Sequence, residues 1–247
     1  MSNRMPPGAF VPGTTIQVRA PGDPGRFASL VDKSRCSRLS NAMCACAAQP
    51  PISVRVTNLG CAKNTTDAEV FLGDLARQGI NVLTDFDGKE EESDVAIINT
   101  CAFVEDAKNE SISAILEAAR GGAKKVVVTG CLAQRYADEL ADLLPEATAI
   151  VGFEHYADLG DKIRAIAGGT PTSRVQVGMA TVPFRPEYDR VRLTGKHYTY
   201  LRVAEGCNHA CTFCSIPGFR GKFRSKPWDS VVEEIKHLAA TGVRELN

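Results

Sequence analysis

From Ile52 onward, short apolar runs alternate with amphipathic helical patterns, and this alternation is the feature that most constrains the fold. The runs 94–100 (DVAIINT) and 125–129 (KVVVT) are rich in β-branched residues, as strands buried on both faces are. Between them, apolar side chains recur at helical spacing over residues 104–120. Such alternation with short connections predicts a parallel sheet covered by helices on both faces. We therefore predict a three-layer α/β domain over residues 51–168.

The expected elements of this domain follow one another in a regular order. Strands are expected at 52–57, 80–84, 94–100, 125–129 and 149–152, with helices at 67–78, 104–120, 134–144 and 157–167. Thr66 and Glu69 have capping-box spacing at the start of the first helix. Gly79 is placed to end that helix.

A second strand–helix pattern begins after a stretch with few helix signals, residues 169–196, which we interpret as a linker with room for one strand. A strand is expected at 197–204, a helix at 228–241 and a further strand at 243–246. Because a parallel strand needs cover on both faces, one such unit cannot close a core. We expect residues 197–247 to be the start of a larger domain, and the chain by itself to be a fragment without activity.

Residues 1–50 differ in composition from the rest. They contain five arginines and only two acidic residues, together with many prolines and serines. An acid-poor leader of this kind is typical of a transit peptide, which would direct the protein to a plastid or mitochondrion rather than the cytoplasm. A disordered tail or a wrongly assigned start codon is the alternative.

Charge and cysteine content exclude several classes of protein. With 29 basic and 29 acidic residues, the chain lacks the strong positive charge of a stand-alone nucleic-acid binder. It has no apolar run near the ~18 residues of a membrane helix. Nine cysteines, widely spaced and odd in number, do not fit a small disulfide scaffold. Ligation of a metal or cluster in a reducing compartment explains them better.

Three of these cysteines form the C-x3-C-x2-C string EGCNHACTFCSIPG, with thiols at Cys207, Cys211 and Cys214. Three thiolates on one loop can hold three irons of a 4Fe-4S cluster and leave the fourth iron open, whereas such clusters usually have four cysteine ligands. A zinc site that adds His209 to the three cysteines is the alternative, because zinc favours mixed Cys/His ligands.

A second set of cysteines follows the expected strands. Cys61, Cys101 and Cys131 each come just after a strand. Loops at the carboxyl ends of parallel strands converge at one edge of a sheet, so three thiols spread over 70 residues of sequence can meet there. Each cysteine taken singly is more often an inert buried residue, but three in equivalent positions indicate a second three-thiolate cluster.

The chain from Ile52 onward resembles the radical S-adenosylmethionine methylthiotransferases, which pair a three-cysteine cluster domain with a radical S-adenosylmethionine domain. The resemblance rests on four strings: LGCAKNTTDAE, NTCAFVEDAKNESI, TGCLAQRY and YLRVAEGCNHACTFCSIPGFRGKFRSKP. They are most similar to the branch that methylthiolates an aspartate of a small-subunit ribosomal protein. The tRNA-modifying branch carries other residues where this chain has Ala62-Lys63-Asn64 and Phe103-Val104-Glu105.

The resemblance implies two 4Fe-4S clusters and S-adenosylmethionine as cofactors. The cluster of Cys207, Cys211 and Cys214 would reductively cleave S-adenosylmethionine to a radical that abstracts a hydrogen atom from the aspartate β-carbon, within a partial βα barrel. The cluster of Cys61, Cys101 and Cys131 would supply the sulfur. No catalytic residue is expected beyond these ligands. The implied partners are a small-subunit ribosomal protein or the assembled subunit and an electron donor such as ferredoxin or flavodoxin, with no membrane and the protein a monomer.

Other candidate residues have weaker support. Phe213 packs against the adenine of the cofactor or, alternatively, anchors its loop as a core aromatic. The alternating basic run RGKFRSK (residues 220–226) is interpreted as a solvated strand face. Packing is the expected role of His197, Tyr198 and Tyr200. A tRNA methylthiotransferase and a non-catalytic zinc-binding module remain the alternative functions.

Overall fold

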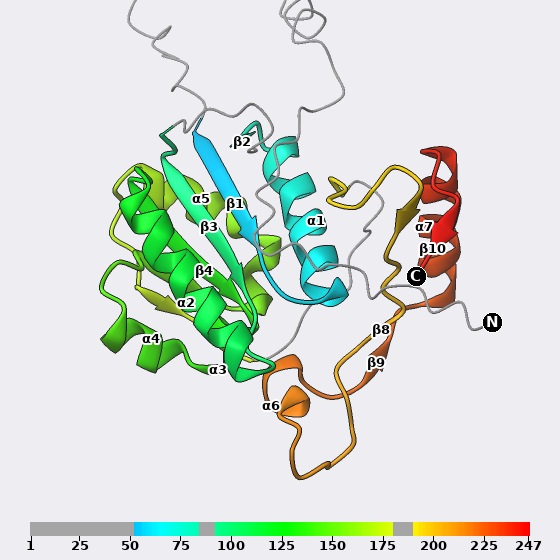
Figure 1. Cartoon of the computed structure of the whole chain (residues 1–247). Coiled ribbons are helices and arrows are strands. Elements are labelled where there is room, and N and C mark those ends of the chain that lie inside the picture. The colour runs from blue at the N-terminus through cyan, green and yellow to red at the C-terminus, as the bar shows by residue number, and fades with distance from the viewer. Residues whose placement is uncertain (1–51, 84–91, 180–189) are drawn as a thin grey trace, which may run out of the picture.

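A computed structural model describes residues 52–83, 92–179 and 190–247, and its centre is a parallel sheet of six strands (Figure 1). The strands lie in the order β2-β1-β3-β4-β5-β6. Their bounds are Ser53–Asn58 (β1), Asn81–Leu83 (β2), Val95–Thr100 (β3), Lys125–Gly130 (β4), Ala149–Val151 (β5) and Val175–Gln176 (β6). The predicted parallel α/β architecture is confirmed. The expected leader, with Cys36, Cys44 and Cys46, and most of the acidic 85–93 connection lie outside the described residues.

Helices cover both faces of this sheet. Their bounds are Ala62–Arg77 (α1), Glu105–Arg120 (α2), Cys131–Arg135 (α3), Ala137–Leu143 (α4) and Leu159–Ala167 (α5), with a 3-10 turn at Phe153–Ala157. α1 and α5 pack together on one face, and α2 lies against β3 and β4 on the other (Figure 1). Every residue of β3 is buried, as its apolar sequence predicts for a central strand.

The order of the strands brings the cysteine-bearing loops together. β1 pairs in parallel with β2 on one side and with β3 on the other. The chain therefore adds β2 on one side of β1 and then crosses over to add β3 on the opposite side. β4 follows as the next neighbour of β3. The strands that precede Cys61, Cys101 and Cys131 are therefore β1, β3 and β4, three consecutive strands of the sheet.

The start of the first helix was placed wrongly by its capping pattern. α1 begins at Ala62, directly after Cys61, and not at Asp67. The Thr66 hydroxyl lies inside the helix and donates a hydrogen bond to the Ala62 carbonyl at 3.1 Å. Glu69 is fully buried and binds residues of the linker. The capping-box spacing was thus coincidental, whereas Gly79 does follow the helix, with a positive φ of 73°.

Two other elements are divided where single ones were expected. The helix expected at 134–144 is two short helices, α3 and α4, which meet at Tyr136. The strand expected at 197–204 is two short strands, β7 (Tyr198–Thr199) and β8 (Ala204–Glu205). The sheet also extends to β6, inside the stretch interpreted as a linker.

The C-terminal segment forms a small unit beside the sheet domain. Its remaining elements are α6 (Ile216–Arg220), β9 (Arg224–Ser225), α7 (Trp228–Ala240) and β10 (Glu245–Leu246). β10 pairs in parallel with β7, as expected for a βα unit, and β8 pairs antiparallel with β9 around the cysteine loop. In the described parts of the chain no helix is long and apolar enough to cross a membrane.

Gly130 shows why the turn before Cys131 requires glycine. Its φ is +92°, a conformation that side-chain-bearing residues rarely adopt. A Cβ at this position would lie 2.4 Å from the Thr100 carbonyl oxygen and 2.5 Å from the Thr100 nitrogen. Both obstacles are backbone of the neighbouring strand and cannot turn aside, so only glycine lets β4 deliver Cys131 next to β3.

We expect Gly130→Ala to lower the free energy of unfolding by roughly 2–3 kcal/mol, because a strained backbone and a clash combine. Gly169→Ala is the matched control, since Gly169 also has a positive φ, 72°, but has nothing within 4 Å of an added Cβ. It should cost only about 1 kcal/mol. Urea denaturation followed by circular dichroism measures both, and equal losses would show that the contact with Thr100 is unimportant.

Candidate functional site

The first group of predicted ligands lies at the carboxyl edge of the sheet. Cys61 is the N-cap of α1, Cys101 directly follows β3, and Cys131 is the first residue of α3. Cys101 and Cys131 are each 6% exposed, whereas Cys61 is exposed. None of the three forms a disulfide. One thiol therefore faces solvent at the mouth of the site and two lie beneath it.

Gly60 brings the first two loops close together. Its φ is +97°, and a Cβ on it would lie 2.9 Å from the Cys101 Cβ and 3.1 Å from the Cys101 sulfur. The absence of a side chain at Gly60 is what lets the Cys101 side chain approach the Cys61 loop. Ser111 fixes the backbone of Cys101 from α2, since its hydroxyl accepts a hydrogen bond from the Cys101 N–H and donates one to the Cys101 carbonyl.

Asn64 connects all three loops, although the sequence did not single it out. Its Nδ2 donates to the carbonyl oxygens of Leu59 and Thr100, at 2.9 and 2.8 Å, just before the first two cysteines. Its Oδ1 accepts from the Cys131 thiol at 3.4 Å. Asn64 is completely buried, so each of these bonds is made away from water. Its position three residues after Cys61, at the start of a helix, was the only signal available.

The electrostatic environment of the thiols reflects their burial. Burial raises the pKa of Cys131 to about 11, although Arg220 opposes this shift through its charge and a hydrogen bond. Burial likewise raises the pKa of Cys101, and the nearby Cys61 adds to the increase. Cys61 also acts on Cys131 in the same sense. Cys61 thus lies close enough to both buried thiols to raise their pKa values.

The residues at this edge fit a thiolate-bound cluster in their chemistry. Soft sulfur ligands favour iron–sulfur centres and zinc over hard cations, and the missing side chain of Gly60 leaves room beside the Cys101 sulfur. As they stand, no three His, Cys, Asp or Glu side chains in the described ranges are grouped so as to hold a metal ion. The edge of the sheet therefore offers three cysteine thiols as candidate ligands.

The second group of predicted ligands lies on the loop between β8 and α6. Cys207 and Cys214 are partly buried and Cys211 is exposed. The three cysteines, together with His209 and Lys222, belong to the lining of an open cavity of about 770 Å³. The His209 N–H donates to the Cys207 sulfur at 3.4 Å. A single loop thus brings three thiols to one cavity, as their spacing predicts.

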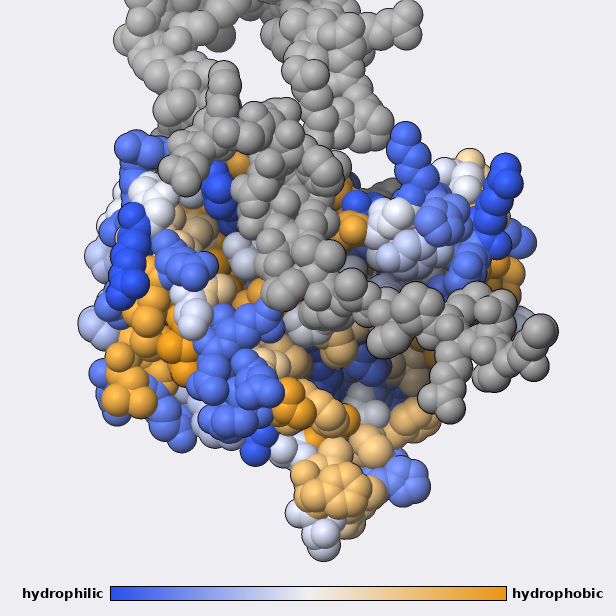
Figure 2. Space-filling model, in the orientation of Figure 1, coloured by the Kyte–Doolittle hydropathy of each residue, from blue (hydrophilic) through white to orange (hydrophobic). Residues whose placement is uncertain are grey.

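This cysteine loop protrudes from the rest of the molecule, and apolar residues gather on it (Figure 2). Phe213 is 90% exposed, so the alternative role of a core anchor is wrong. Contact with a cofactor adenine stays a prediction for Phe213, which is not among the residues that line the cavity. The rings of His197, Tyr198 and Tyr200 pack on one another, as expected.

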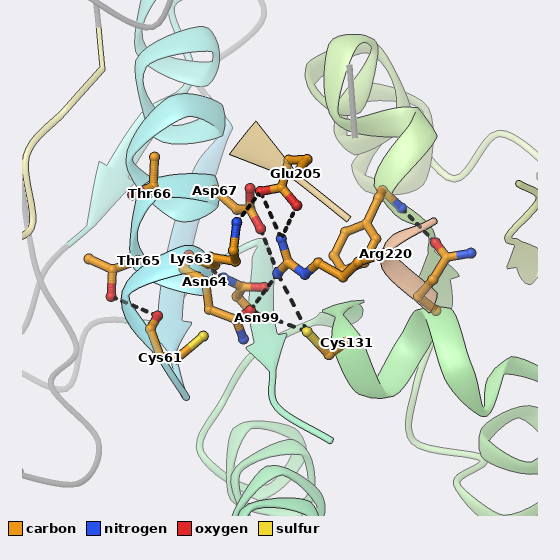
Figure 3. A network of polar contacts seen from close by, with 12 residues as sticks. Cys61, Lys63, Asn64, Thr65, Thr66, Asp67, Asn99, Cys131, Glu205 and Arg220 are labelled. Atoms are coloured by element: carbon orange, nitrogen blue, oxygen red, sulfur yellow. Dashed lines mark hydrogen bonds and ion pairs between the residues drawn. The ribbon is translucent and has the colours of Figure 1, made fainter. Parts of the chain in front are cut away.

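A network of charges joins the first cysteine group to the C-terminal segment, where Arg220 and Glu205 meet Lys63 and Asp67 of α1 (Figure 3). Asp67 of α1 forms ion pairs with Arg202 at 2.5 Å and with Arg220 at 2.9 Å. Glu205 of β8 lies 3.4 Å from Arg202, 3.5 Å from Arg220 and 3.3 Å from Lys63. Burial raises the pKa of Glu205, but these three cations outweigh that effect and the net pKa is lowered. The carboxylates of the network therefore hold the C-terminal segment against α1.

The interpretation of RGKFRSK as a solvated face was wrong for two of its four cations. Arg220 is 3% exposed and binds the network just described, and Lys226 is 6% exposed and pairs with Glu234 of α7. Lys222 is exposed, as expected. A related pair lies further along α1, where Glu69 binds Arg190 at 3.4 Å and Arg190 also reaches Glu234. Alternation in sequence did not reveal these partners, because each lies on an element outside the run itself.

Comparisons with known proteins match two separate ranges of the chain. Residues 53–152 match a family described as uncharacterized protein family UPF0004, and residues 201–247 match the radical SAM superfamily. The chain is 42% identical over 199 residues to the ribosomal protein uS12 methylthiotransferase RimO of Clostridium tetani, covering 79% of this chain and 43% of the relative. RimO of Symbiobacterium thermophilum is 41% identical, with 79% and 40% covered. The chain thus spans less than half the length of the curated relatives that it matches.

The burial of the six thiols predicts their order of alkylation in the metal-free protein. Cys61 and Cys211 are exposed and should react with iodoacetamide first. Cys131 should react last, because its thiol is buried and its pKa is raised to about 11, which leaves little thiolate at pH 8. Peptide mass spectrometry after timed quenching measures the order, and the same reaction in urea is the control. Early modification of Cys131 in the folded protein would contradict this placement of its side chain.

Proposed function

Because the chain belongs to the radical S-adenosylmethionine methylthiotransferase family, we propose that it carries the cluster-binding machinery of a RimO-type enzyme. The observation that carries the proposal is the convergence of Cys61, Cys101 and Cys131 at the ends of three consecutive strands. The second three-cysteine loop directly precedes α6 in the chain, and Arg220 at the end of α6 contacts Cys131. Two open cysteine sets joined by buried contacts suit a reaction that needs two centres.

The proposed cofactors are iron–sulfur clusters and S-adenosylmethionine. Cys207, Cys211 and Cys214 would hold one 4Fe-4S cluster, and Cys61, Cys101 and Cys131 a second. Bound there, these groups supply the radical chemistry that an unactivated C–H bond requires and a site for the sulfur to be transferred. The number of clusters, two, follows from the two sets of ligands.

The chain's own residues hold, orient and shield these centres. Asn64 fixes the three loops of the first set relative to one another. Gly206, with a φ of +74°, packs so closely on residues 221 and 222 that a Cβ would lie 2.2 Å from the Lys222 carbonyl. The Cys207 N–H donates to the Gly221 carbonyl at 3.1 Å. These contacts close the base of the second loop and leave its tip, with Cys211, open to the cofactor.

The proposed substrate is an aspartate of a small-subunit ribosomal protein. Its support is the printed activity of the relatives, which are named as methylthiotransferases of ribosomal protein uS12. An electron donor of the ferredoxin or flavodoxin kind, a monomeric state and a plastid or mitochondrial location complete the proposal. The location rests only on the composition of residues 1–50.

Anaerobic reconstitution followed by metal analysis tests the two-cluster proposal. We expect about eight irons and as many acid-labile sulfides per chain. Replacement of Cys207, Cys211 and Cys214 together by alanine should reduce the iron to about four, and so should replacement of Cys61, Cys101 and Cys131. Zinc without labile sulfide would instead indicate the structural metal site in which His209 joins the cysteines, and the enzyme proposal would fall.

An assay of product tests the substrate. The protein, continued to the length of its relatives, is incubated with S-adenosylmethionine, a reductant and either a uS12 peptide or tRNA. We expect mass spectrometry to find a methylthio group on the peptide aspartate and none on the tRNA. Modification of the tRNA alone would assign the chain to the other branch. The 247-residue chain, assayed in parallel, tests the expectation that it is inactive on its own.

A further inference from the structure

We propose that Arg220 is a positioning residue that couples the two cysteine sets. It lies in the C-terminal segment that carries Cys207, Cys211 and Cys214, and it donates a hydrogen bond to the sulfur of Cys131. This hydrogen bond raises the reduction potential of the cluster held by Cys61, Cys101 and Cys131. The inference rests on the proposed function, since it concerns a cluster that these cysteines would hold. It goes beyond that function by assigning a role to a residue that is not a ligand.

The position of Arg220 supports this role. It is the last residue of α6, in the same short segment as Cys214, yet its side chain is 3% exposed and points into the sheet domain (Figure 3). Its Nη2 lies 3.4 Å from the Cys131 sulfur and 2.8 Å from Asn64 Oδ1. Asn64 is the residue that ties the three cysteine loops together. Arg220 therefore contacts the first ligand set at its most connected point.

The orientation of the guanidinium is fixed by its other partners. Asp67 Oδ2 lies 2.9 Å from Nη2 in an ion pair, and both oxygens of Glu205 lie 3.5 Å from Nη1. The guanidinium carbon lies 4.5 Å from the centre of the Phe153 ring, in a cation–π contact. A planar group held in several directions cannot turn away from Cys131, so its N–H is aimed at the sulfur before any cluster binds.

The charge of the network favours a negative centre beside Cys131. Three cations, Lys63, Arg202 and Arg220, face two carboxylates, Asp67 and Glu205. The cations therefore outnumber the carboxylates by one, although each cation lies within ion-pair distance of a carboxylate. Hydrogen bonds to the sulfurs and nearby positive charge stabilise the reduced, more negative form of an iron–sulfur cluster. Loss of Arg220 should consequently make the cluster harder to reduce.

The test isolates one cluster and measures its potential. In the chain with Cys207, Cys211 and Cys214 replaced by alanine, only the first ligand set remains. Redox titration followed by electron paramagnetic resonance gives the midpoint potential of its cluster, with and without R220M. We expect R220M to shift the potential to a lower value. R220K keeps the charge and a donor, so its potential should stay close to that of the chain with Arg220.

Arg202 provides the matched control. It is also buried, at 6% exposed, and binds the same two carboxylates from the other side. R202M removes the same charge from the network but leaves the hydrogen bond between Arg220 and the Cys131 sulfur in place, so it should lower the potential much less than R220M does. Because an unpaired buried carboxylate destabilises a protein strongly, we add the double variants D67N/R220M and D67N/R202M. They remove the carboxylate together with its cation and give the same comparison if the single variants fail to fold.

The outcomes separate the two proposals. If the triple-alanine chain binds no iron or labile sulfide, the proposed function itself is wrong for this site. If it binds a cluster and R220M lowers the potential clearly more than R202M does, the inference is supported. If the Arg220 and Arg202 variants shift the potential equally, or neither does, Arg220 is a structural ion-pair residue and the inference is overturned.

Discussion

The placement of the C-terminal segment depends on carboxylates buried along one side of α1. Asp67 and Glu69 are at most 1% exposed. Their cationic partners all come from residues after the sheet domain: Arg190, Arg202 and Arg220. Burying such charges costs several kcal/mol per ion unless partners and hydrogen bonds compensate. An ion pair of this kind adds little net stability, but it strongly penalises any other packing. The network thus specifies one position for the segment that carries the second cysteine loop.

The parallel sheet provides the complementary constraint. Because β2 and β3 lie on opposite sides of β1, the strand order changes at β1, and the loops after the neighbouring strands β1, β3 and β4 open onto one edge of the sheet. Gly60 and Gly130 permit the turns there, each in a conformation and a space that a side chain would not tolerate. The Asn64 side chain donates hydrogen bonds to the backbone carbonyl oxygens of Leu59 and Thr100 at these turns, where water would otherwise bind. The cysteines are rigidly placed by the fold, and Arg220 connects them to the loop that lies outside it.

Much of this organisation was predictable from local pattern, and the failures are instructive. The buried runs at β3 and β4 and the helix α2 were predicted almost to the residue, since apolar periodicity is strong there. The start of α1 was missed because Thr66 and Glu69 imitate a capping box, while the true N-cap, Cys61, makes no side-chain cap. Arg220 was taken as solvated because its partner Asp67 lies far away in sequence, and Lys226 because its partner Glu234 lies on the following helix, which no alternation in the run itself reveals.

The sequence by itself determined the α/β class, the position of each cysteine after its strand and the three-thiol loop, because these follow from local periodicity and spacing. Only the tertiary structure decided which strands are neighbours, that Asn64 joins the three loops, and that a cation of the second loop contacts a thiol of the first set. The physical reason is that strand order and buried ion pairing depend on contacts between distant segments. Arg220 and Asn64 are 156 residues apart in the chain, and no local pattern records that they meet.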